Sequence, residues 1–448
     1  MEILIKTSQF LLSLSFLIIL HELGHYIPAK IFKIKVEKFY LFFDYKFSLI
    51  KKKVNDTVYG IGWIPLGGYV KIAGMIDESM DKEQLSKPPQ PWEFRSKPAW
   101  MRLIVMLGGV IVNFILGYTI YILILFIWGE SYLDNKSLKD GVWITNKLGN
   151  EIGLETGDKI ISVDGTEIEI FSSIPGEFIN GEKYVIERNG EQIEKQIPVD
   201  LISKIIDGGK QEAMFLSPRI PFVVGELSED SHNLNSGLQA KDLIIGIQNQ
   251  KIKYFDEAES LLNSLKGQEV EITVLREMVE TKLQIKVSEE GKIGMLVGSL
   301  TPEDMQALGY YKLKSKDFKL AEAIPAGSTK ATKVLLDYIK QLKKIFNPET
   351  GAYKGLGGFI SIGSIFPSVW SWQTFLSITA FLSIMLGFMN LLPIPALDGG
   401  HVAFTLFEMI TGKKPSDKFL EYAQISGFVI LMSLLFIANG NDLIKLFN

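Results

Sequence analysis

The segment His21-Glu22-Leu23-Gly24-His25 combines two metal-binding side chains with a carboxylate. Histidines four positions apart share one face of an α-helix, so both imidazoles can reach a single ion. Glu22, beside the first histidine, is placed to take a proton from a water on that ion. Zinc lowers the pKa of such a water from 15.7 to ~7, so this pattern is typical of metal-assisted hydrolysis.

An apolar run at residues 7–29 contains this motif. The run is long enough for a transmembrane helix, which needs about 20 mainly apolar residues. It lacks the small-residue cleavage site of a signal peptide, and this favours a retained helix. Each ionisable group inside such a helix costs at least ~2.5 kcal/mol, so the cluster indicates a functional site. The alternative is a polar cluster that only packs helices together.

A third ligand must come from elsewhere, because catalytic zinc usually takes three protein ligands and one water. The best candidate is Asp398 in the segment Asn390-Leu391-Leu392-Pro393-Ile394-Pro395-Ala396-Leu397-Asp398-Gly399-Gly400. Its two prolines should break a helix, and its paired glycines let the backbone turn the carboxylate inward. The alternative is an Asp-Gly turn that ends the helix at the surface. His232 is expected in a surface loop, and His401 either at the surface or beside the metal ligands.

Three further apolar runs follow, at residues 101–128, 373–393 and 424–439, and the last is short for a span. The residues between the second and third runs alternate and turn like those of a soluble β-rich protein. The sequence therefore predicts a multi-pass α-helical membrane protein, with about four transmembrane helices and an inserted β-rich module. The chain has no cysteine, which excludes disulfides and thiolate metal ligands.

Lysines are concentrated next to particular helix ends. They crowd residues 30–53 after the first run, and Lys413, Lys414 and Lys418 lie between the third and fourth runs. Short loops rich in Lys and Arg stay in the cytoplasm. We therefore expect both termini and the β-rich module on the outer side of the membrane.

The β-rich module contains an internal repeat. GLETGDKIISVDGTEI at residues 153–168 and GLQAKDLIIGIQNQKI at residues 237–252 align without gaps. Such self-similarity predicts two copies of one small domain, and the turns and short strands resemble those of the PDZ domain. PDZ domains bind extended peptides by adding a strand to a sheet edge. A spacer or size filter that binds no peptide is the alternative.

Two shorter elements are expected close to the membrane. Residues 60–70 consist of strand-forming segments broken by Gly and Pro and are too short to span, which predicts a β-hairpin that dips into the membrane face. Residues 331–346 form an amphipathic helical pattern. This helix either lies on the membrane surface or packs onto a neighbouring domain.

The order of these parts resembles the site-2 protease family of zinc intramembrane metalloproteases, in particular its bacterial RseP type. The resemblance rests on HELGH in the first membrane helix, Gly-Gly-Val-Ile-Val-Asn at residues 108–113, the PDZ-like repeats and NLLPIPALDGG in the third helix. It implies an endopeptidase of the bacterial inner membrane that cleaves transmembrane segments. His21, His25 and Asp398 would bind Zn²⁺, and Glu22 would be the catalytic acid and base.

The resemblance also implies a substrate-binding set. Asn390 would help to hold the unwound substrate, although packing between helices is an alternative role for it. The hairpin would pair with the substrate as an extended strand through Gly62, Trp63, Ile64, Gly67, Gly68 and Tyr69. The substrate would be an anti-sigma factor or a leftover signal peptide, screened by the PDZ-like pair on the periplasmic side. The lipid bilayer is the other partner, and no nucleic acid is expected.

The predicted domains follow from these assignments. Residues 1–130 and 373–448 form the two parts of the membrane core, residues 131–216 and 217–300 the PDZ-like domains, and residues 301–372 a connector with the amphipathic helix. Gly108, Gly109, Asn113 and Gly117 are expected to pack helices together. Two other functions fit some of these features: a membrane scaffold with a structural metal, and an ion transporter, although no inverted helix repeat is visible.

Overall fold

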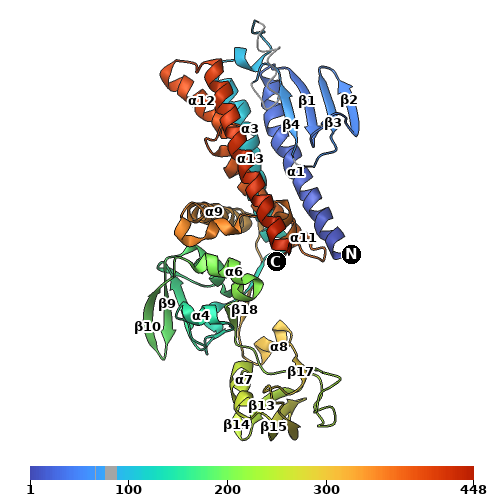
Figure 1. Cartoon of the computed structure of the whole chain (residues 1–448), viewed down its shortest axis with the longest axis vertical. Helices are drawn as coiled ribbons and strands as arrows, with labels where there is room; N and C mark the ends of the chain where they lie inside the picture. Colours follow the sequence, from blue (N-terminus) through green and yellow to red (C-terminus); the bar gives the residue numbers. More distant parts are fainter. Residues whose placement is uncertain (66, 76–87, 448) are drawn as a thin grey trace. The chain divides into compact units, whose positions relative to one another are not determined.

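The computed structural model describes residues 1–65, 67–75 and 88–447 of the chain (Figure 1). It divides into two compact units. The first unit consists of Met1–Gly129, Asp317–Lys343 and Lys354–Asn448, and the second of Glu130–Lys316 and Lys344–Tyr353. The second unit is thus an insertion between helices of the first.

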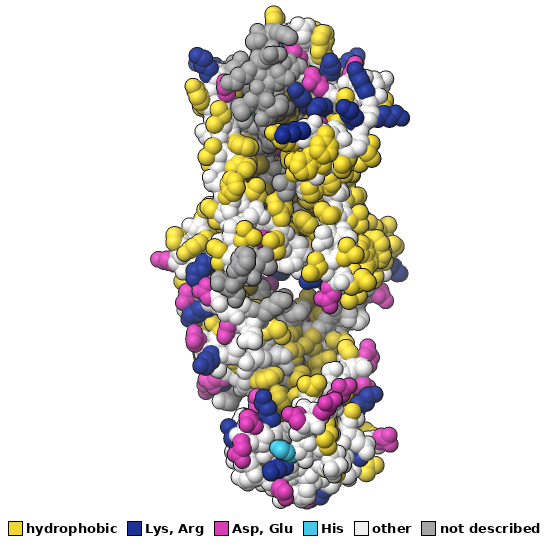
Figure 2. Space-filling model, turned by 45° about the vertical axis from the view of Figure 1, so that its right-hand side comes forward, with side chains coloured by type: hydrophobic (Ala, Val, Ile, Leu, Met, Phe, Trp, Pro, Cys, Tyr) yellow, Lys and Arg dark blue, Asp and Glu magenta, His cyan; other side chains and the backbone are white. Residues whose placement is uncertain are grey.

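The first unit is helical. Its helices are α1 (Glu2–Ile31), α3 (Ala99–Trp128), α9 (Leu320–Ile345, whose last residues belong to the second unit), α10 (Phe359–Ser364), α11 (Trp372–Leu391), α12 (Asp398–Thr411) and α13 (Asp417–Phe447). Among the described residues, four segments are long and apolar enough to cross a bilayer: Glu2–Ile31, Ala99–Trp128, Trp372–Leu391 and Lys418–Lys445. These contain or closely match the four predicted runs. Hydrophobic side chains accordingly cover much of this unit in the upper part of Figure 2.

The fourth span extends beyond residues 424–439 at both ends. Polar residues such as Glu421 and Asn441 end the apolar run in the sequence, but they do not end the helix. The N-terminus of α1 and the C-terminus of α13 lie at the same end of this unit (Figure 1).

Small residues bring the helices into close contact. A Cβ at Gly108 of α3 would overlap the carbonyl of Gly24 of α1, and a Cβ at Gly327 of α9 would lie 2.6 Å from Ile122 Cα. The Tyr338 ring of α9 also contacts Phe381 and Phe388 of α11. The amphipathic helix therefore packs against α3 and α11 of the same unit, and its position on the membrane surface stays a prediction.

A four-stranded sheet follows α1 in the chain. It has the order β2-β3-β1-β4 and consists of β1 (Val36–Leu41), β2 (Ile50–Val54), β3 (Thr57–Ile61) and β4 (Tyr69–Ile72). Strand β1 is parallel to β3, with Lys38 opposite Val58, and antiparallel to β4, with Tyr40 opposite Tyr69. Strands β2 and β3 are antiparallel, with Ile50 opposite Ile61. Strand β4 therefore forms one edge of the sheet.

The prediction of a hairpin at residues 60–70 was wrong in its pairing. The strands on either side of this segment, β3 and β4, both pair with β1 and not with each other. Gly62 donates to the Leu41 carbonyl and Ile64 forms a bridge with Phe43, so the segment crosses over the end of β1. The hairpin of this sheet is β2-β3, made from the lysine-rich residues that were interpreted only as a loop. Leu66 lies outside the described residues.

The second unit contains two similar sheets. The first has the order β10-β9-β7-β8 and the second β14-β13-β15-β16, and the pairs β11-β6, β12-β17 and β18-β5 complete the strands. The strands are β5 (Glu130–Leu133), β6 (Val142–Ile144), β7 (Lys159–Val163), β8 (Thr166–Glu167), β9 (Lys183–Arg188), β10 (Glu191–Gln196), β11 (Leu216–Pro218), β12 (Val224–Leu227), β13 (Leu243–Ile247), β14 (Gln250–Lys251), β15 (Glu269–Arg276), β16 (Val279–Lys286), β17 (Met295–Val297) and β18 (Leu313–Lys316). The helices are α4 (Lys147–Glu151), α5 (Ile174–Asn180), α6 (Leu201–Ala213), α7 (Phe255–Ser264) and α8 (Pro302–Ala307).

Each sheet has its own apolar core and the same buried ion pair. In the first copy, Arg188 donates to both oxygens of Asp158 at 2.7 Å and to the Gly153 carbonyl. In the second copy, Arg276 donates to both oxygens of Asp242 at 2.7 and 2.6 Å and to the Gly237 carbonyl. The aligned segments contain the aspartates and glycines but not the arginines, so the structure extends the repeat beyond the part visible in the sequence.

Candidate metal centre

Helix α1 presents His21 and His25 to Asp398, which lies at the start of α12. The two Nε2 atoms are 3.3 Å apart, and each lies 3.3 Å from Asp398 Oδ2. The three side chains come from segments almost 400 residues apart in the chain and form a group that could hold a metal ion. Helix periodicity explains the histidine pair, because residues i and i+4 project from one face.

The donor atoms have the spacing that tetrahedral zinc requires. Zinc binds His nitrogen and carboxylate oxygen at about 2.0–2.1 Å, and a tetrahedron of that size has edges of about 3.3–3.4 Å. All three measured separations match this edge. Asp398 Oδ2 is buried and accepts no hydrogen bond. Because buried carboxylate oxygens are normally paired, this atom is suited to a cation.

The outer nitrogen of each histidine is held by α3. His25 Nδ1 donates to the Val105 carbonyl at 2.8 Å, which leaves a lone pair on Nε2. His21 Nδ1 lies 3.0 Å from the amide nitrogen of Asn113. When His21 binds metal through Nε2, Nδ1 carries the proton, and a 180° rotation of the Asn113 amide supplies the acceptor oxygen. Asn113, interpreted from the sequence as a packing residue, therefore contacts the site directly.

Glycines on α3 make room for the imidazoles. A Cβ at Gly109 would overlap His25 Nε2 and would lie 2.7 Å from His21 Cε1. The neighbouring Gly108 lets the backbones of α3 and α1 meet at Gly24. The Gly108-Gly109 pair thus packs helices, as predicted, and also shapes the metal centre.

A tight loop presents Asp398. Helix α11 ends at Leu391, two residues before Pro393, and α12 begins at Asp398, as expected from the two prolines. The left-handed residue in this loop is Ala396, with φ +77°, and not one of the glycines. Gly399 and Gly400 serve a different purpose, because a Cβ on either would overlap or crowd the carbonyls of Leu392 and Ile394.

Glu22 and the edge of the sheet border the same cavity. The backbone N–H of Val70 in β4 lies close enough to the Glu22 carboxylate to interact with its charge. The cavity has a volume of about 990 Å³, and its lining includes the three candidate ligands, Glu22 and residues 68–72. Strand β4 contributes side chains from both of its faces because it is the edge strand.

Only some of the predicted substrate-binding residues line this cavity. Ile64, Gly68 and Tyr69 line the cavity with the candidate ligands. Gly62, Trp63, Gly67 and Asn390 are not among the described residues that line it. Trp63 instead stacks on Phe47, with ring centroids 5.6 Å apart, and donates from Nε1 to the Tyr45 carbonyl. Asn390 is partly buried near the end of α11.

A charged cluster adds polarity to the cavity wall. Tyr69 donates to Asp44 Oδ1 at 2.7 Å, and Lys38 Nζ lies 3.4 Å from Asp44 Oδ2. Burial raises the pKa of Asp44, but the hydrogen bond from Tyr69 and the charge of Lys38 outweigh it and hold the pKa below its ordinary value. Of this cluster only Tyr69 was predicted; Lys38 and Asp44 were not, because β1 and the residues that follow it were not recognised as part of a sheet.

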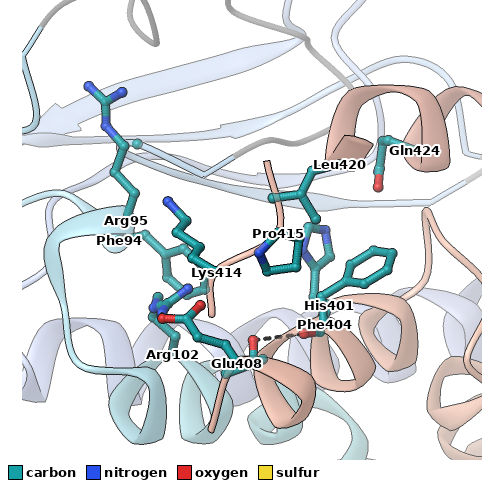
Figure 3. Close-up of a pocket in the computed structure, with 12 residues that line it drawn as sticks. Phe94, Arg95, Arg102, His401, Phe404, Glu408, Lys414, Pro415, Leu420 and Gln424 are labelled. Carbon is teal, nitrogen blue, oxygen red and sulfur yellow. Dashed lines mark hydrogen bonds and ion pairs between the residues drawn. The ribbon is translucent and has the colours of Figure 1, made fainter. Parts of the chain in front are cut away.

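A second, smaller pocket of about 60 Å³ adjoins the site (Figure 3). Arg102 and Glu408 lie at one end of it and are joined by a hydrogen bond of 2.5 Å. His401 and Gln424 line both this pocket and the larger cavity. His401 therefore borders the cavity that also contains the candidate metal ligands.

Comparison with known proteins identifies relatives that are named as proteases. The family model described as peptidase family M50 matches residues 9–434. A Campylobacter jejuni protein named as a zinc metalloprotease is 29% identical, over 97% of this chain and 92% of its own length. The "Regulator of sigma E protease" of Haemophilus influenzae and the "Protease RseP" of Yersinia pestis are each 26% identical over 100% of both chains.

The matched region contains the three candidate metal ligands, and their donor atoms have the spacing of a zinc site. Four described helices are suited to cross a membrane. The chain therefore belongs to peptidase family M50, and it is a membrane-bound zinc metalloprotease.

Proposed function

We propose that this protein is an intramembrane endopeptidase, which cleaves transmembrane segments of other membrane proteins. One observation carries the proposal: the candidate zinc ligands and Glu22 line a cavity between helices that are apolar enough to lie in the bilayer. A site at that depth is suited to peptide bonds that are themselves within the membrane.

His21, His25 and Asp398 would hold the zinc ion. When bound there, zinc makes a water acidic enough to attack at neutral pH and polarises the scissile carbonyl. Glu22 takes the proton of the attacking water and later donates it to the leaving amine. The Val70 N–H would lie beside the Glu22 carboxylate in this role, and the Val105 carbonyl fixes the proton of His25 on Nδ1.

The substrate must unwind before cleavage. A helical peptide bond is shielded, and in lipid the freed backbone groups need hydrogen-bond partners. Strand β4 is an edge strand beside Glu22, so its outer edge can pair with an extended segment. Ile64, Gly68 and Tyr69 would contact that segment from the cavity wall. Gly62, Trp63 and Gly67 would act by holding the crossing loop, and Asn390 would act from the end of α11.

Location and substrates follow from the relatives and the charge pattern. One relative is named for regulation of sigma E, so an anti-sigma factor is a suitable substrate class, with leftover signal peptides as the second. The protein would lie in the bacterial inner membrane with its two repeats on the periplasmic side. Residues 131–216 and 217–300 would be PDZ-like domains that bind or screen the substrate.

The test compares the chain with Glu22→Gln in membranes that contain small single-span proteins. Mass spectrometry should detect cleaved membrane peptides with the unaltered chain, and their formation should fall about 10²–10⁴-fold with Glu22→Gln. Zinc content should be the same in both. The matched control is Glu2→Gln in the first turn of α1, which should cleave normally. Full activity of Glu22→Gln would refute the role assigned to Glu22. Zinc without any cleavage by the unaltered chain would favour a scaffold with a structural metal.

A further inference from the structure

Helix α13 contacts the loop that presents Asp398. Gln424 is a buried polar residue of this helix, and its Oε1 accepts a hydrogen bond of 3.2 Å from the Ala396 backbone N–H. One turn later, a Cβ at Gly427 would overlap the Pro395 carbonyl oxygen. Residues 424 and 427 are three positions apart, so one face of α13 lies against the loop.

This loop needs support from outside itself. Ala396 has φ +77°, a conformation that residues with a side chain rarely adopt and that persists only where surrounding contacts hold it. Ala396 is partly buried in the cavity wall, and its backbone N–H is satisfied by the side chain of Gln424. The loop's own hydrogen bonds run from Ile394 to Leu392 and from Leu397 to Ile394, and they leave the Ala396 N–H to Gln424.

We propose that Gln424 is a positioning residue, which holds Ala396 in its left-handed conformation and thereby keeps Asp398 Oδ2 in place opposite the two histidines. The inference rests on the proposed function, because it assigns Gln424 a role in the same metal site. Ala396 is two residues from Asp398, so a change of its backbone conformation redirects the carboxylate. Helix α13 is therefore part of the metal site as well as a membrane span.

The position of Gln424 fits this role. It lies in the wall shared by the large cavity and the small pocket, at the end away from Arg102 and Glu408 (Figure 3). A side chain needed only for packing would be apolar there, since Phe428 and Met432 of the same helix line the cavity with apolar groups. An amide buried on this face points to the hydrogen bond that it makes.

The test measures zinc affinity of the full chain in detergent micelles, by competition with a graded series of chelator concentrations. Gln424→Leu and Gln424→Met keep the volume of the side chain but remove the acceptor. Both variants should lose zinc at chelator concentrations about 10–100-fold lower than the unaltered chain does. This is the usual effect of losing a hydrogen bond that supports a metal ligand. Gln424→Glu keeps an acceptor oxygen and should restore most of the affinity. Ser433→Ala, on an exposed part of α13, is the matched control.

Each outcome separates the two proposals. If the unaltered chain binds no zinc, the proposed function itself fails. If it binds zinc and both acceptor-free variants bind it equally well, the role of Gln424 is refuted while the function stands. If both variants fail to fold while Gln424→Glu folds, the residue is structural, and the positioning role is likewise overturned.

Discussion

Asp398 in the helical unit and Asp158 in the repeat unit are both carboxylates removed from bulk water, but their surroundings differ. Asp158 is 1% exposed and saturated, with two hydrogen bonds from Arg188 and one from the Glu155 backbone N–H. Asp242 has the equivalent partners in the second copy. Asp398 Oδ2, in contrast, accepts no hydrogen bond and faces two imidazole nitrogens.

This difference separates residues that maintain a fold from residues that perform chemistry. A buried ion pair with all its hydrogen bonds made is complete, and nothing more can bind to it. A buried oxygen without a donor is costly, at about 1–3 kcal/mol, and its retention indicates that a ligand compensates for it. Asn113, whose Oδ1 is also buried without a donor, belongs to the same incomplete group around His21.

The largest contrast is expected between Asp398→Ala and Asp158→Ala. Asp398→Ala should abolish zinc binding and cleavage while the helices remain folded, because only a ligand is lost. Asp158→Ala should retain zinc but lower the free energy of unfolding of the first repeat by about 1–3 kcal/mol, since Arg188 loses its two hydrogen bonds to Asp158 and keeps those to Glu155 and the Gly153 carbonyl. Zinc analysis and denaturant unfolding of both variants measure this. Stoichiometric zinc in Asp398→Ala would remove the distinction.

A smaller effect is expected from crowding the metal centre without replacing any of its ligands. The added methyl of Gly109→Ala would overlap His25 Nε2, and overpacking of this kind typically costs about 1–3 kcal/mol. Zinc affinity should therefore fall by roughly tenfold or more. The control is Gly440→Ala in α13, where a Cβ would meet nothing within 4 Å. Equal zinc affinity in the two variants would show that α3 can move away from α1.

The sequence predicted those parts of the molecule that depend on local periodicity. The helical spacing of His21 and His25 and the length of the apolar runs correctly indicated a paired histidine face and four spans. Pro393 and Pro395 also correctly indicated the end of α11. The choice of Asp398 came from chemistry, since zinc needed a third ligand, and the structure places it at the required distance.

The sequence analysis did not predict contacts between residues that are far apart in the chain. Asn113 and Gly109 reach the histidines only because α3 crosses α1 at Gly24, and no pattern within α3 shows this. The Gly and Pro residues of the segment 60–70 mark breaks between strands, but they do not show that both β3 and β4 pair with β1. Gln424 was missed for a related reason: it is the first residue of the predicted run 424–439, and nothing in that run shows that its hydrogen-bond partner lies in a distant loop.

The smallest effect concerns Asp140, which forms an exposed ion pair with Lys253 in the repeat unit. It is neither fully paired and buried like Asp158 nor buried without a hydrogen bond like Asp398 Oδ2. Lys253 and Tyr254 of the second copy both hydrogen-bond to Asp140 of the first, and the hydrogen bond from Lys253 is the main cause of its lowered pKa. Because the pKa is lower in the folded protein than its ordinary value of 3.8, the contact stabilises above about pH 4 and weakens as the pH falls further.

The Asp140 side chain is 41% exposed, so solvent screening keeps this contribution within about 1 kcal/mol. Hydrogen exchange of residues 220–256 should be faster in Asp140→Asn than in the unaltered chain at pH 6, and the two should converge as the pH approaches 3. Comparison at each pH cancels the intrinsic pH dependence of exchange. Equal exchange in the two proteins at pH 6 would mean that packing of Trp143 on Phe255, and not charge, joins the two copies.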